Sequence, residues 1–237
     1  MTSDTIRVKP GLSDDGKLVS VTSRNNERKI EAKYSVMESH LHGKLLHVGC
    51  IGPGVDENLD WFHRWLVTQS EEVVGLDLDE EGVKQARSEG YDCRVADAEN
   101  FNLEEKFDTV VAANVIEHLN NPGGMIQSAK DHLADEGQLV ITTPHTFTPQ
   151  NLLRELHGGI DPNHDHVAWY CKETLRHILN RYGLEMTAYE AWGFDRVGVT
   201  TLDRAWRRIE RVLARVPRLE KIDKYQHLVV AQRTVLS

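Results

Sequence analysis

Glycines and an acid lie at spacings that suit a nucleoside ligand. Gly49, Gly52 and Gly54 follow one short apolar run, and Asp77 ends the next. Glycine lets the backbone turn tightly and approach a ligand closely, and a carboxylate at the end of a buried strand can accept hydrogen bonds from two ribose hydroxyls. The order of apolar run, glycine turn, helix-length segment, apolar run and acid therefore predicts a nucleoside-binding cleft.

The glycine spacing argues against a dinucleotide. A dinucleotide fingerprint has the pattern Gly-x-Gly-x-x-Gly, whereas the glycines here are spaced by three residues and then by two. A NAD-dependent Rossmann oxidoreductase therefore stays only as an alternative. We interpret His47, in the first apolar run, as a hydrogen-bonded strand residue, and Asp79 as the N-cap of the helix that follows Asp77.

A second acid and a polar loop follow the next two apolar runs. Asp97 and Ala98 come after the third run, where a carboxylate can reach an adenine amino group. Asp97 alone is a weak signal, because aspartate after a strand is commonly a turn residue. After the fourth run the chain has Asn114-Val-Ile-Glu117-His118. The ordered set indicates a nucleoside site more specifically than any one of its members.

Apolar runs alternate with helix-length segments through most of the chain. Runs that are apolar without strict alternation suit strands that are buried on both faces. Such strands are expected at Leu45–Val48, Val73–Leu76, Tyr91–Val95, Thr109–Ala113, Gln138–Thr142, Leu184–Trp192 and Tyr225–Arg233. The helices expected with them are Asp60–Thr68, Glu80–Glu89, Met125–Leu133 (ended by Gly137), Gln150–Leu156 and Lys172–Arg181. This order predicts an α/β fold with a Rossmann-like, doubly wound sheet.

The remaining segments suggest surface and substrate roles. Residues 1–43 are expected to form an N-terminal arm and a covering helix, and residues 44–237 the main domain. Within it, about 145–168 is irregular and follows a strand end, where substrate-binding loops commonly lie. A basic helix is expected over about 202–216. Three interpretations of this helix stay open: a solvated face, a peripheral contact with anionic lipid, and self-association. The oligomeric state therefore stays open as well.

Composition bounds the class of protein. The chain has 237 residues, of which 40% are hydrophobic, and no apolar run approaches the roughly 18 residues of a membrane span. The first residues lack the basic-then-apolar pattern of a secretory signal, and the three scattered cysteines suit a reducing compartment. We therefore expect a soluble, cytoplasmic protein. A net charge of −9 argues against a nucleic-acid partner.

From Lys44 to Gly183 the chain resembles the class I S-adenosylmethionine-dependent methyltransferases. The resemblance rests on the glycine turn, the acids at 77 and 97, and the Val115–Leu119 and Gly137–Pro144 segments, which occur in the family's order. The later His166–Tyr170 segment resembles the branch that contains ubiquinone-biosynthesis-type and glycan-associated methyltransferases. The resemblance implies a seven-stranded, mostly parallel sheet whose last strand is antiparallel, and S-adenosyl-L-methionine as the cofactor.

The resemblance also implies roles for these residues. The glycine turn would lie against the methionine portion of the cofactor, Asp77 would hold the ribose, and Asp97 with Ala98 would flank the adenine. The full set of expected cofactor-binding residues is Gly49, Cys50, Gly52, Gly54, Asp77, Leu78, Asp97, Ala98 and Asn114. The family's turn is Gly-x-Gly-x-Gly after an acid, so His47 and the extra Ile51 depart from it. These departures support a second alternative, a non-catalytic S-adenosylmethionine-binding or interaction protein.

The expected chemistry needs few groups. Methyl transfer from a sulfonium is an in-line displacement that mainly requires an aligned acceptor and exclusion of water, and an oxygen acceptor also needs a base. His118, His145 and His166 are the candidate catalytic residues. Some ubiquinone-type relatives hold a metal with Glu-x-x-Glu-His; because Asn114 stands at the first of these positions, no metal is expected. We therefore predict an S-adenosylmethionine-dependent methyltransferase, with O-methylation of a small or lipid-linked acceptor as the reaction.

Overall fold

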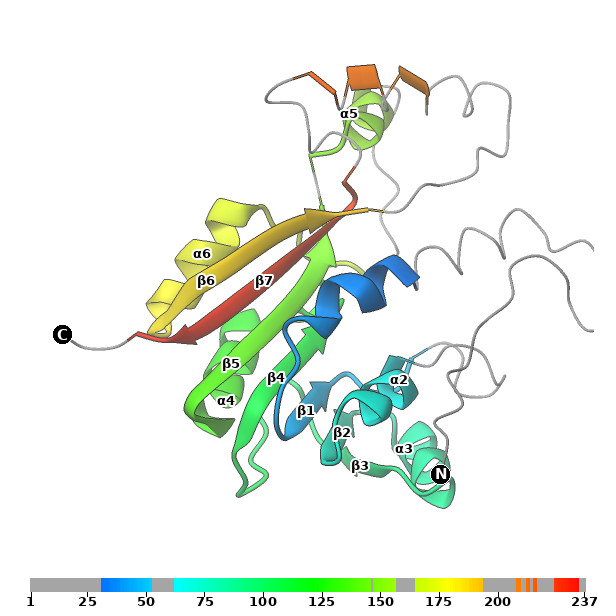
Figure 1. Ribbon diagram of the computed structural model, residues 1–237, viewed down its shortest axis with the longest axis vertical. Helices are drawn as coiled ribbons and strands as arrows, with labels where there is room; N and C mark the ends of the chain where they lie inside the picture. Colours follow the sequence, from blue (N-terminus) through cyan, green and yellow to red (C-terminus); the bar gives the residue numbers. More distant parts are fainter. Residues whose placement is uncertain are drawn as a thin grey trace, which may run out of the picture.

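A seven-stranded sheet in the order β3-β2-β1-β4-β5-β7-β6 forms the centre of the molecule (Figure 1). The computed structural model describes residues 31–52, 62–145, 147–156, 165–193, 208–209, 212–213, 215–216 and 224–234. The strands are β1 (Leu45–Val48), β2 (Val73–Asp77), β3 (Asp92–Val95), β4 (Phe107–Ala113), β5 (Leu133–Pro144), β6 (Leu184–Trp192) and β7 (Gln226–Arg233). Each strand expected from the sequence overlaps one of these strands.

The strand directions place the expected site residues at one edge of the sheet. β3, β2, β1, β4 and β5 pair in parallel, and β7 runs antiparallel to both β5 and β6. This arrangement confirms the predicted Rossmann-like sheet, mostly parallel with an antiparallel last strand. Because parallel strands end at the same edge, the loops after β1, β2, β3 and β4 come together there.

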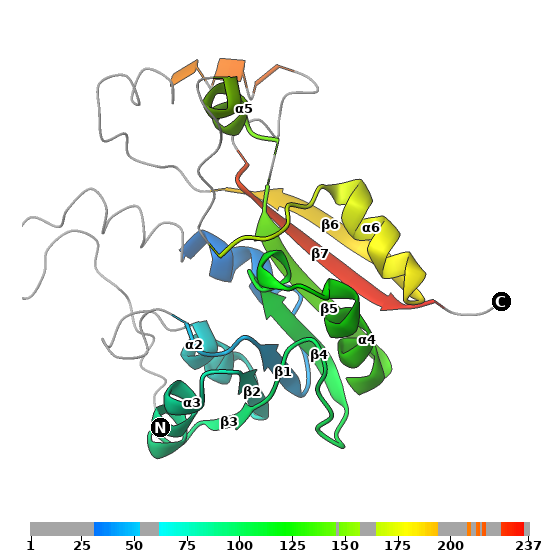
Figure 2. The same ribbon diagram turned by 180° about the vertical axis from the view of Figure 1, so that it is seen from behind.

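Helices cover both faces of the sheet. The labelled helices are α2 (Phe62–Gln69), α3 (Glu80–Ser88), α4 (Pro122–His132), α5 (Pro149–Leu156) and α6 (Lys172–Arg181), with a short 3₁₀ helix, η1 (Ile116–His118). A further helix spans 31–38. α4 and α6 lie on the face that is in front in Figure 2, and the 31–38 helix and α2 lie on the opposite face, which is in front in Figure 1.

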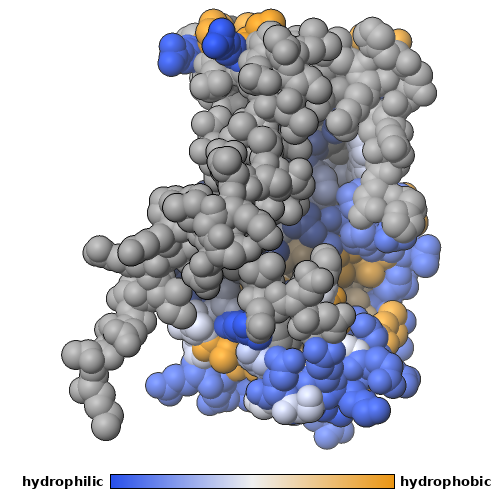
Figure 3. Space-filling view, turned by 90° about the vertical axis from the view of Figure 1, so that its right-hand side faces the viewer, coloured by the Kyte–Doolittle hydropathy of each residue, from blue (hydrophilic) through white to orange (hydrophobic). Residues whose placement is uncertain are grey.

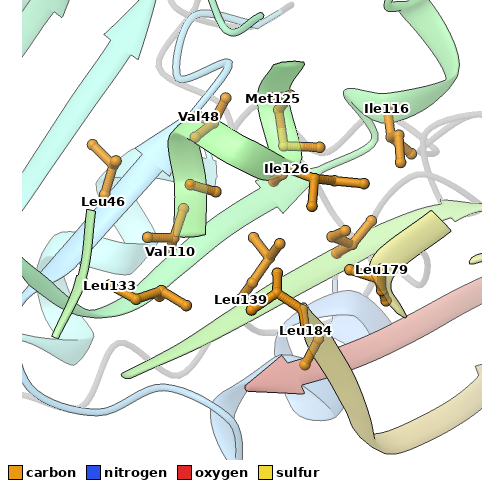
Figure 4. Close-up of a cluster of buried hydrophobic side chains, with 14 of the residues drawn as sticks. Leu46, Val48, Val110, Ile116, Met125, Ile126, Leu133, Leu139, Leu179 and Leu184 are labelled. Atoms are coloured by element: carbon orange, nitrogen blue, oxygen red, sulfur yellow. The ribbon is translucent and has the colours of Figure 1, made fainter. Parts of the chain in front are cut away.

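The strands bury side chains on both faces, as their unbroken apolar runs predict. Val110 and Leu139 point into the larger cluster, which packs under α4 and α6 (Figure 4). Val111 and Val140 point the other way, against Met37 of the 31–38 helix. Alternate residues of one strand therefore reach different helices, and the sheet is clamped between two layers.

The expectation that Gly137 ends the helix before β5 is wrong. α4 ends at His132, and Leu133 already has extended backbone and begins β5. Leu133 pairs with Phe107 of β4, and its side chain is buried in the core, so packing stops the helix earlier than the glycine suggests. Gly137 lies inside β5, where a Cβ would approach the Phe107 carbonyl oxygen to 2.8 Å.

Two predicted segments fall wholly or largely outside the described residues. These are the N-terminal arm expected before the covering helix, within residues 1–43, and most of the basic helix over about 202–216. The covering helix is present at 31–38. Within the described part of the chain, every helix is too short or too polar to cross a membrane.

Candidate cofactor and catalytic site

The turn after β1 folds over the end of β2. Gly49 has a φ of +71°, and the backbone N–H groups of Gly49 and Cys50 both donate to the carbonyl oxygen of Leu76, at 2.9 and 3.0 Å. A Cβ on Gly49 would lie 2.7 Å from Cγ2 of Val115. Glycine is required here because the backbone is left-handed and approaches the loop after β4 closely. Gly52 continues this turn, and Gly54 lies outside the described residues.

Asp77 ties this turn to the end of β2. Its Oδ2 accepts a hydrogen bond from the Ile51 N–H at 2.8 Å, and its Oδ1 accepts one from the Asp79 N–H at 3.0 Å. Each carboxylate oxygen has two lone pairs, so both oxygens can accept a further donor from a ligand. Leu78, beside it, is 64% exposed at the same edge. The carboxylate is therefore fixed in position and partly open to solvent.

Asp79 has the capping role expected of it. Its Oδ1 accepts a hydrogen bond from the Gly82 N–H at 3.0 Å at the start of α3. This bond satisfies one of the unpaired donors of the first helical turn. The prediction for Asp79 is thus confirmed, and Asp77 is the carboxylate of this pair that faces the turn after β1.

Asp97 and Ala98 lie beside Asp77, at the end of the neighbouring strand. The Ala96 N–H donates to the Asp77 carbonyl oxygen at 2.9 Å, which holds the ends of β2 and β3 together. The Asp97 Oδ1 accepts from the Glu99 N–H at 2.8 Å, so this side chain shapes its own turn while remaining exposed. Ala98 packs against the larger core cluster.

Asn114 is held by hydrogen bonds at both ends of its amide. It follows β4 with a φ of +60°, an uncommon conformation for a residue other than glycine. Its Nδ2 donates to Oε1 of Glu117 and to Oε1 of Gln226, both at 3.0 Å, and its Oδ1 accepts from the Thr142 hydroxyl at 3.3 Å. No local sequence pattern points to Gln226, because its contact with Asn114 spans 112 residues. These bonds fix the loop after β4.

The buried Glu117 joins this loop to the segment at 165–170. Its side chain is buried, with Oε2 accepting from the Thr143 hydroxyl at 2.9 Å. Its backbone carbonyl accepts from the N–H groups of Val167 and Ala168, at 2.9 and 3.2 Å. Two segments that are about fifty positions apart in the chain therefore meet at this residue.

The contacts of Glu117 bring His118 and His166 together. Their ring centroids are 4.7 Å apart, and the rings are nearly perpendicular at 82°. Nδ1 of His118 lies 3.2 Å from the carbonyl oxygen of Asp165. Because a carbonyl oxygen only accepts, this geometry assigns the proton to Nδ1 of His118 and leaves Nε2 to accept or to bind.

His166 has a lowered pKa. Its burial disfavours the charged ring, and the nearby His118 acts in the same direction, whereas the carboxylates of Glu117 and Asp165 oppose them. The pKa therefore lies below the ordinary 6.5 of histidine. A ring that is neutral at pH 7 can accept a proton from an acceptor hydroxyl.

His145 belongs to a neighbouring group of side chains. It follows β5, forms an isolated bridge with Tyr170, and contacts the ring of His227, which is tilted by 55° with 4.3 Å between ring centroids. His227 is buried, and its Nδ1 lies 2.8 Å from the hydroxyl of Tyr189. His227 and Tyr189 come from β7 and β6, so sequence reasoning had no local pattern by which to find them.

The Glu117 neighbourhood also offers a set of metal ligands. Glu117, His118 and His166 each place a ligand atom within 4.8 Å of the others. One carboxylate with two imidazoles is a donor set that suits a divalent transition metal. Sequence reasoning expected no metal, because Asn114 takes one position of the relatives' motif. The structure offers His166, from a distant segment, as a third ligand.

The expected site residues lie at one edge of the sheet. Figure 3 shows that hydrophilic side chains cover most of the described lower part of the molecule. The ends of β1 to β4 point towards α5 in Figure 1. Ligand sites in open α/β sheets lie at such carboxyl edges.

Comparisons with known proteins agree with this arrangement. The model of a family described as "Methyltransferase domain" matches residues 24–189 of the chain. The chain belongs to this methyltransferase family. The match confirms the predicted enzyme class and its cofactor, S-adenosylmethionine, in place of a NAD-dependent oxidoreductase. No curated protein sequence gives a significant match.

Several solved structures share the fold. Magnesium protoporphyrin IX methyltransferase from Synechocystis, with bound S-adenosylhomocysteine, is 14% identical, over 92% of this chain and 90% of that one, with a TM-score of 0.59. The protein in complex with the Trm112 methyltransferase activator of Haloferax volcanii is 15% identical, over 90% and 92%, with a TM-score of 0.61. The 1,6-didemethyltoxoflavin-N1-methyltransferase of Burkholderia thailandensis is 15% identical, over 89% and 80%, with a TM-score of 0.56. At these identities the likeness concerns the fold.

A matched pair of substitutions tests the nucleoside-binding role of Asp77. We expect Asp77→Asn to weaken S-adenosylhomocysteine binding about 10- to 150-fold, since a hydrogen bond to a charged group contributes about 1.5–3 kcal/mol. Asp79→Asn makes the same chemical change two residues away but preserves the cap, because asparagine is an equally good N-cap. Calorimetric titration measures both affinities, and circular dichroism checks the folding of both variants. Equal affinities would refute the ribose role of Asp77.

Proposed function

We propose that this methyltransferase transfers the methyl group of S-adenosylmethionine to an oxygen atom of a small or lipid-linked acceptor, with His166 as the base. The observation that carries this proposal is the pairing of His118 and His166 beside the loop of Asn114. This pairing brings a proton acceptor (His166), a second imidazole (His118) and the buried carboxylate of Glu117 to the edge of the sheet where the proposed cofactor-binding turns meet.

The cofactor would lie across the ends of β1, β2 and β3. In this proposal Gly49, Cys50, Gly52 and Gly54 border the methionine portion, Asp77 and Leu78 the ribose, and Asp97 and Ala98 the adenine. Two observations support this placement. Gly49 has a left-handed backbone at a position where a Cβ would clash with Val115, and the carboxylate of Asp77 is fixed by its hydrogen bond to Ile51. Asn114 would lie near the transferred methyl group. Because its amide is held by Glu117, Gln226 and Thr142, it would shape the site rather than react.

The chemical step requires few protein groups. Bound S-adenosylmethionine supplies an electrophilic methyl group, and its thioether leaves without protonation. His166 would remove the acceptor's proton, while His118, oriented by its bond to the Asp165 carbonyl, would direct the acceptor oxygen. His145, at the end of β5, would contact the acceptor from the other side.

Exposed apolar side chains support a lipid-linked acceptor. Phe147, Leu152 and Leu156 follow β5 and are 74%, 63% and 73% exposed. The two leucines are four residues apart on α5, so they share one helix face. Such a face can hold an acyl or prenyl chain, or rest on a membrane surface. The segment from His166 to Tyr170 supports placement in the branch with ubiquinone-biosynthesis-type and glycan-associated enzymes.

An acceptor panel tests the proposed reaction. The panel contains a catechol, an aliphatic alcohol, a primary amine and a carboxylic acid, each with and without a decyl chain. We expect methylation of a hydroxyl oxygen, with the chain-bearing compound preferred. His166→Gln should lower kcat by about 10²- to 10⁴-fold, the usual contribution of a general base, with S-adenosylhomocysteine affinity unchanged.

His177→Gln is the matched control, because His177 lies exposed on α6 beside Arg176. It should leave kcat as in the unaltered enzyme. Methylation of the amine alone, or full activity of His166→Gln, would overturn the proposal. Product masses and methyl positions are read by mass spectrometry and NMR.

The pH dependence follows from the environment of His166. Because its pKa lies below 6.5, the neutral, basic ring is present at pH 7, and kcat should fall only as the pH drops through this lowered pKa. His118 lowers the pKa of His166, so His118→Gln should move the acidic limb to higher pH. A limb that stays in place, measured with the hydroxyl acceptor in both proteins, would exclude His166 as the titrating base.

A metal-assisted version of the same reaction is the second candidate, favoured by the grouping of Glu117, His118 and His166. A divalent cation held by these side chains would lower the pKa of the acceptor hydroxyl. Chelation separates the two candidates. The base mechanism predicts that enzyme treated with EDTA retains its kcat. Loss of activity that Mn²⁺ or Zn²⁺ restores, in the unaltered enzyme but not in His118→Gln, would show that a metal does this work.

A further inference from the structure

A gap in one row of side chains lies beneath the turn after β1. Cys93, Gly75 and His47 are paired in register across β3, β2 and β1, so their side-chain positions share one face of the sheet. Gly75 contributes no side chain. A Cβ there would lie 2.7 Å from Sγ of Cys50 and 2.9 Å from Cε1 of His63. These two side chains therefore fill the space above Gly75.

His63 bridges the two ends of this row. It is fully buried on α2, with Nδ1 3.2 Å from Nδ1 of His47 and Nε2 3.6 Å from Sγ of Cys93. Burial, and then the neighbouring His63 and Lys33, hold the pKa of His47 well below its usual range. His47 is therefore neutral, and the imidazole of His63 is fixed beside the Cys93 sulfur.

The two cysteine side chains lie in one buried cluster. Cys50, 1% exposed, and Cys93, 0% exposed, pack together with Val83 and Ala86. The neighbouring Cys50 thiol, and then His63, lower the pKa of Cys93 to about 6 against the opposing effect of burial, and Cys93 in turn raises the pKa of Cys50. Cys93 thus has thiolate character, and Cys50 lies beside it as a second thiol that can resolve an oxidised sulfur.

We propose that Cys50 and Cys93 are a redox-modification site that hydrogen peroxide converts to a reversible disulfide. The Cys93 thiolate attacks one peroxide oxygen, the O–O bond breaks, and sulfenic acid forms with release of hydroxide, which takes up a proton as water. The Cys50 sulfur, giving up its proton, then attacks the Cys93 sulfur, and the sulfenic oxygen leaves as a second water. Two electrons pass from the two sulfurs to the peroxide. A dithiol reverses the bond by exchange.

The disulfide would reshape the turn that is proposed to hold the cofactor, and this consequence rests on that proposed function. A sulfur–sulfur bond of about 2.05 Å is much shorter than a non-bonded contact. Cys50 would therefore be drawn towards β3, together with Gly49 and Ile51, whose N–H donates to Asp77. A displacement on the order of 1 Å at a positioning element can cost about 100-fold, so cofactor affinity should fall by about 10- to 100-fold on oxidation.

Peptide mass spectrometry tests the bond itself. The full chain carrying Cys171→Ser is treated with hydrogen peroxide, remaining thiols are blocked with iodoacetamide, and the protein is digested. We expect a linked pair of peptides that contain Cys50 and Cys93, two hydrogens lighter than their sum and separated by dithiothreitol. Cys50→Ser and Cys93→Ser, near-isosteric changes, should each lack it. His63→Gln should form it several-fold more slowly, because the Cys93 thiolate loses its partner.

Calorimetric titration with S-adenosylhomocysteine then compares the reduced and oxidised protein. A linked pair with weaker, dithiothreitol-restored binding supports the proposal. Sulfinic acid or no product at Cys93, with no linked pair, would overturn it. Formation of the bond with unchanged affinity would overturn the effect on the turn. Reduced protein that binds no S-adenosylhomocysteine would instead refute the proposed function, while the peptide result would still decide whether the disulfide forms.

Discussion

The buried carboxylate of Glu117 is the constraint on which the catalytic side of the molecule depends. A carboxylate removed from water must be hydrogen-bonded, since an unpaired buried charge costs several kcal/mol or more. Its two oxygens receive hydrogen bonds from Asn114 and Thr143, on the loop after β4 and at the end of β5. Its backbone carbonyl receives the N–H groups of Val167 and Ala168. One residue therefore holds three parts of the chain in register.

The position of His166 is a consequence of this network. His166 belongs to a segment that follows an irregular stretch of the chain, and it reaches His118 because the adjacent residues bond to Glu117. The same contacts bury His166 enough to lower its pKa. The network thus sets both where the imidazole lies and which protonation state it holds at neutral pH. On the cofactor side, Asp77 has the corresponding role, because it fixes the turn after β1 through the Ile51 N–H.

The strands and most helices could be predicted because their signals are local. An apolar run such as Leu45–Val48 is complete within four residues, and Asp79 caps a helix three residues away. Gly137 shows how a local signal fails, since the distant partner Phe107 drew Leu133 into β5 and ended α4 first. Gln226, His227 and His63 carried no signal, because their roles exist only once residues far along the chain are packed against them.

Local packing explains both departures from the family's glycine turn. Ile51 does not disrupt the turn: its N–H is bound by Asp77, and its side chain packs against Gly82 at the start of α3. His47 occupies the position where an acid is usual. Its side chain is buried against His63 rather than facing a ligand. A carboxylate in that position would lie buried against the His63 imidazole and the Phe62 ring. A neutral imidazole can be buried there at far lower cost, so the replacement of the acid follows from the side chains of α2 that pack beneath the turn.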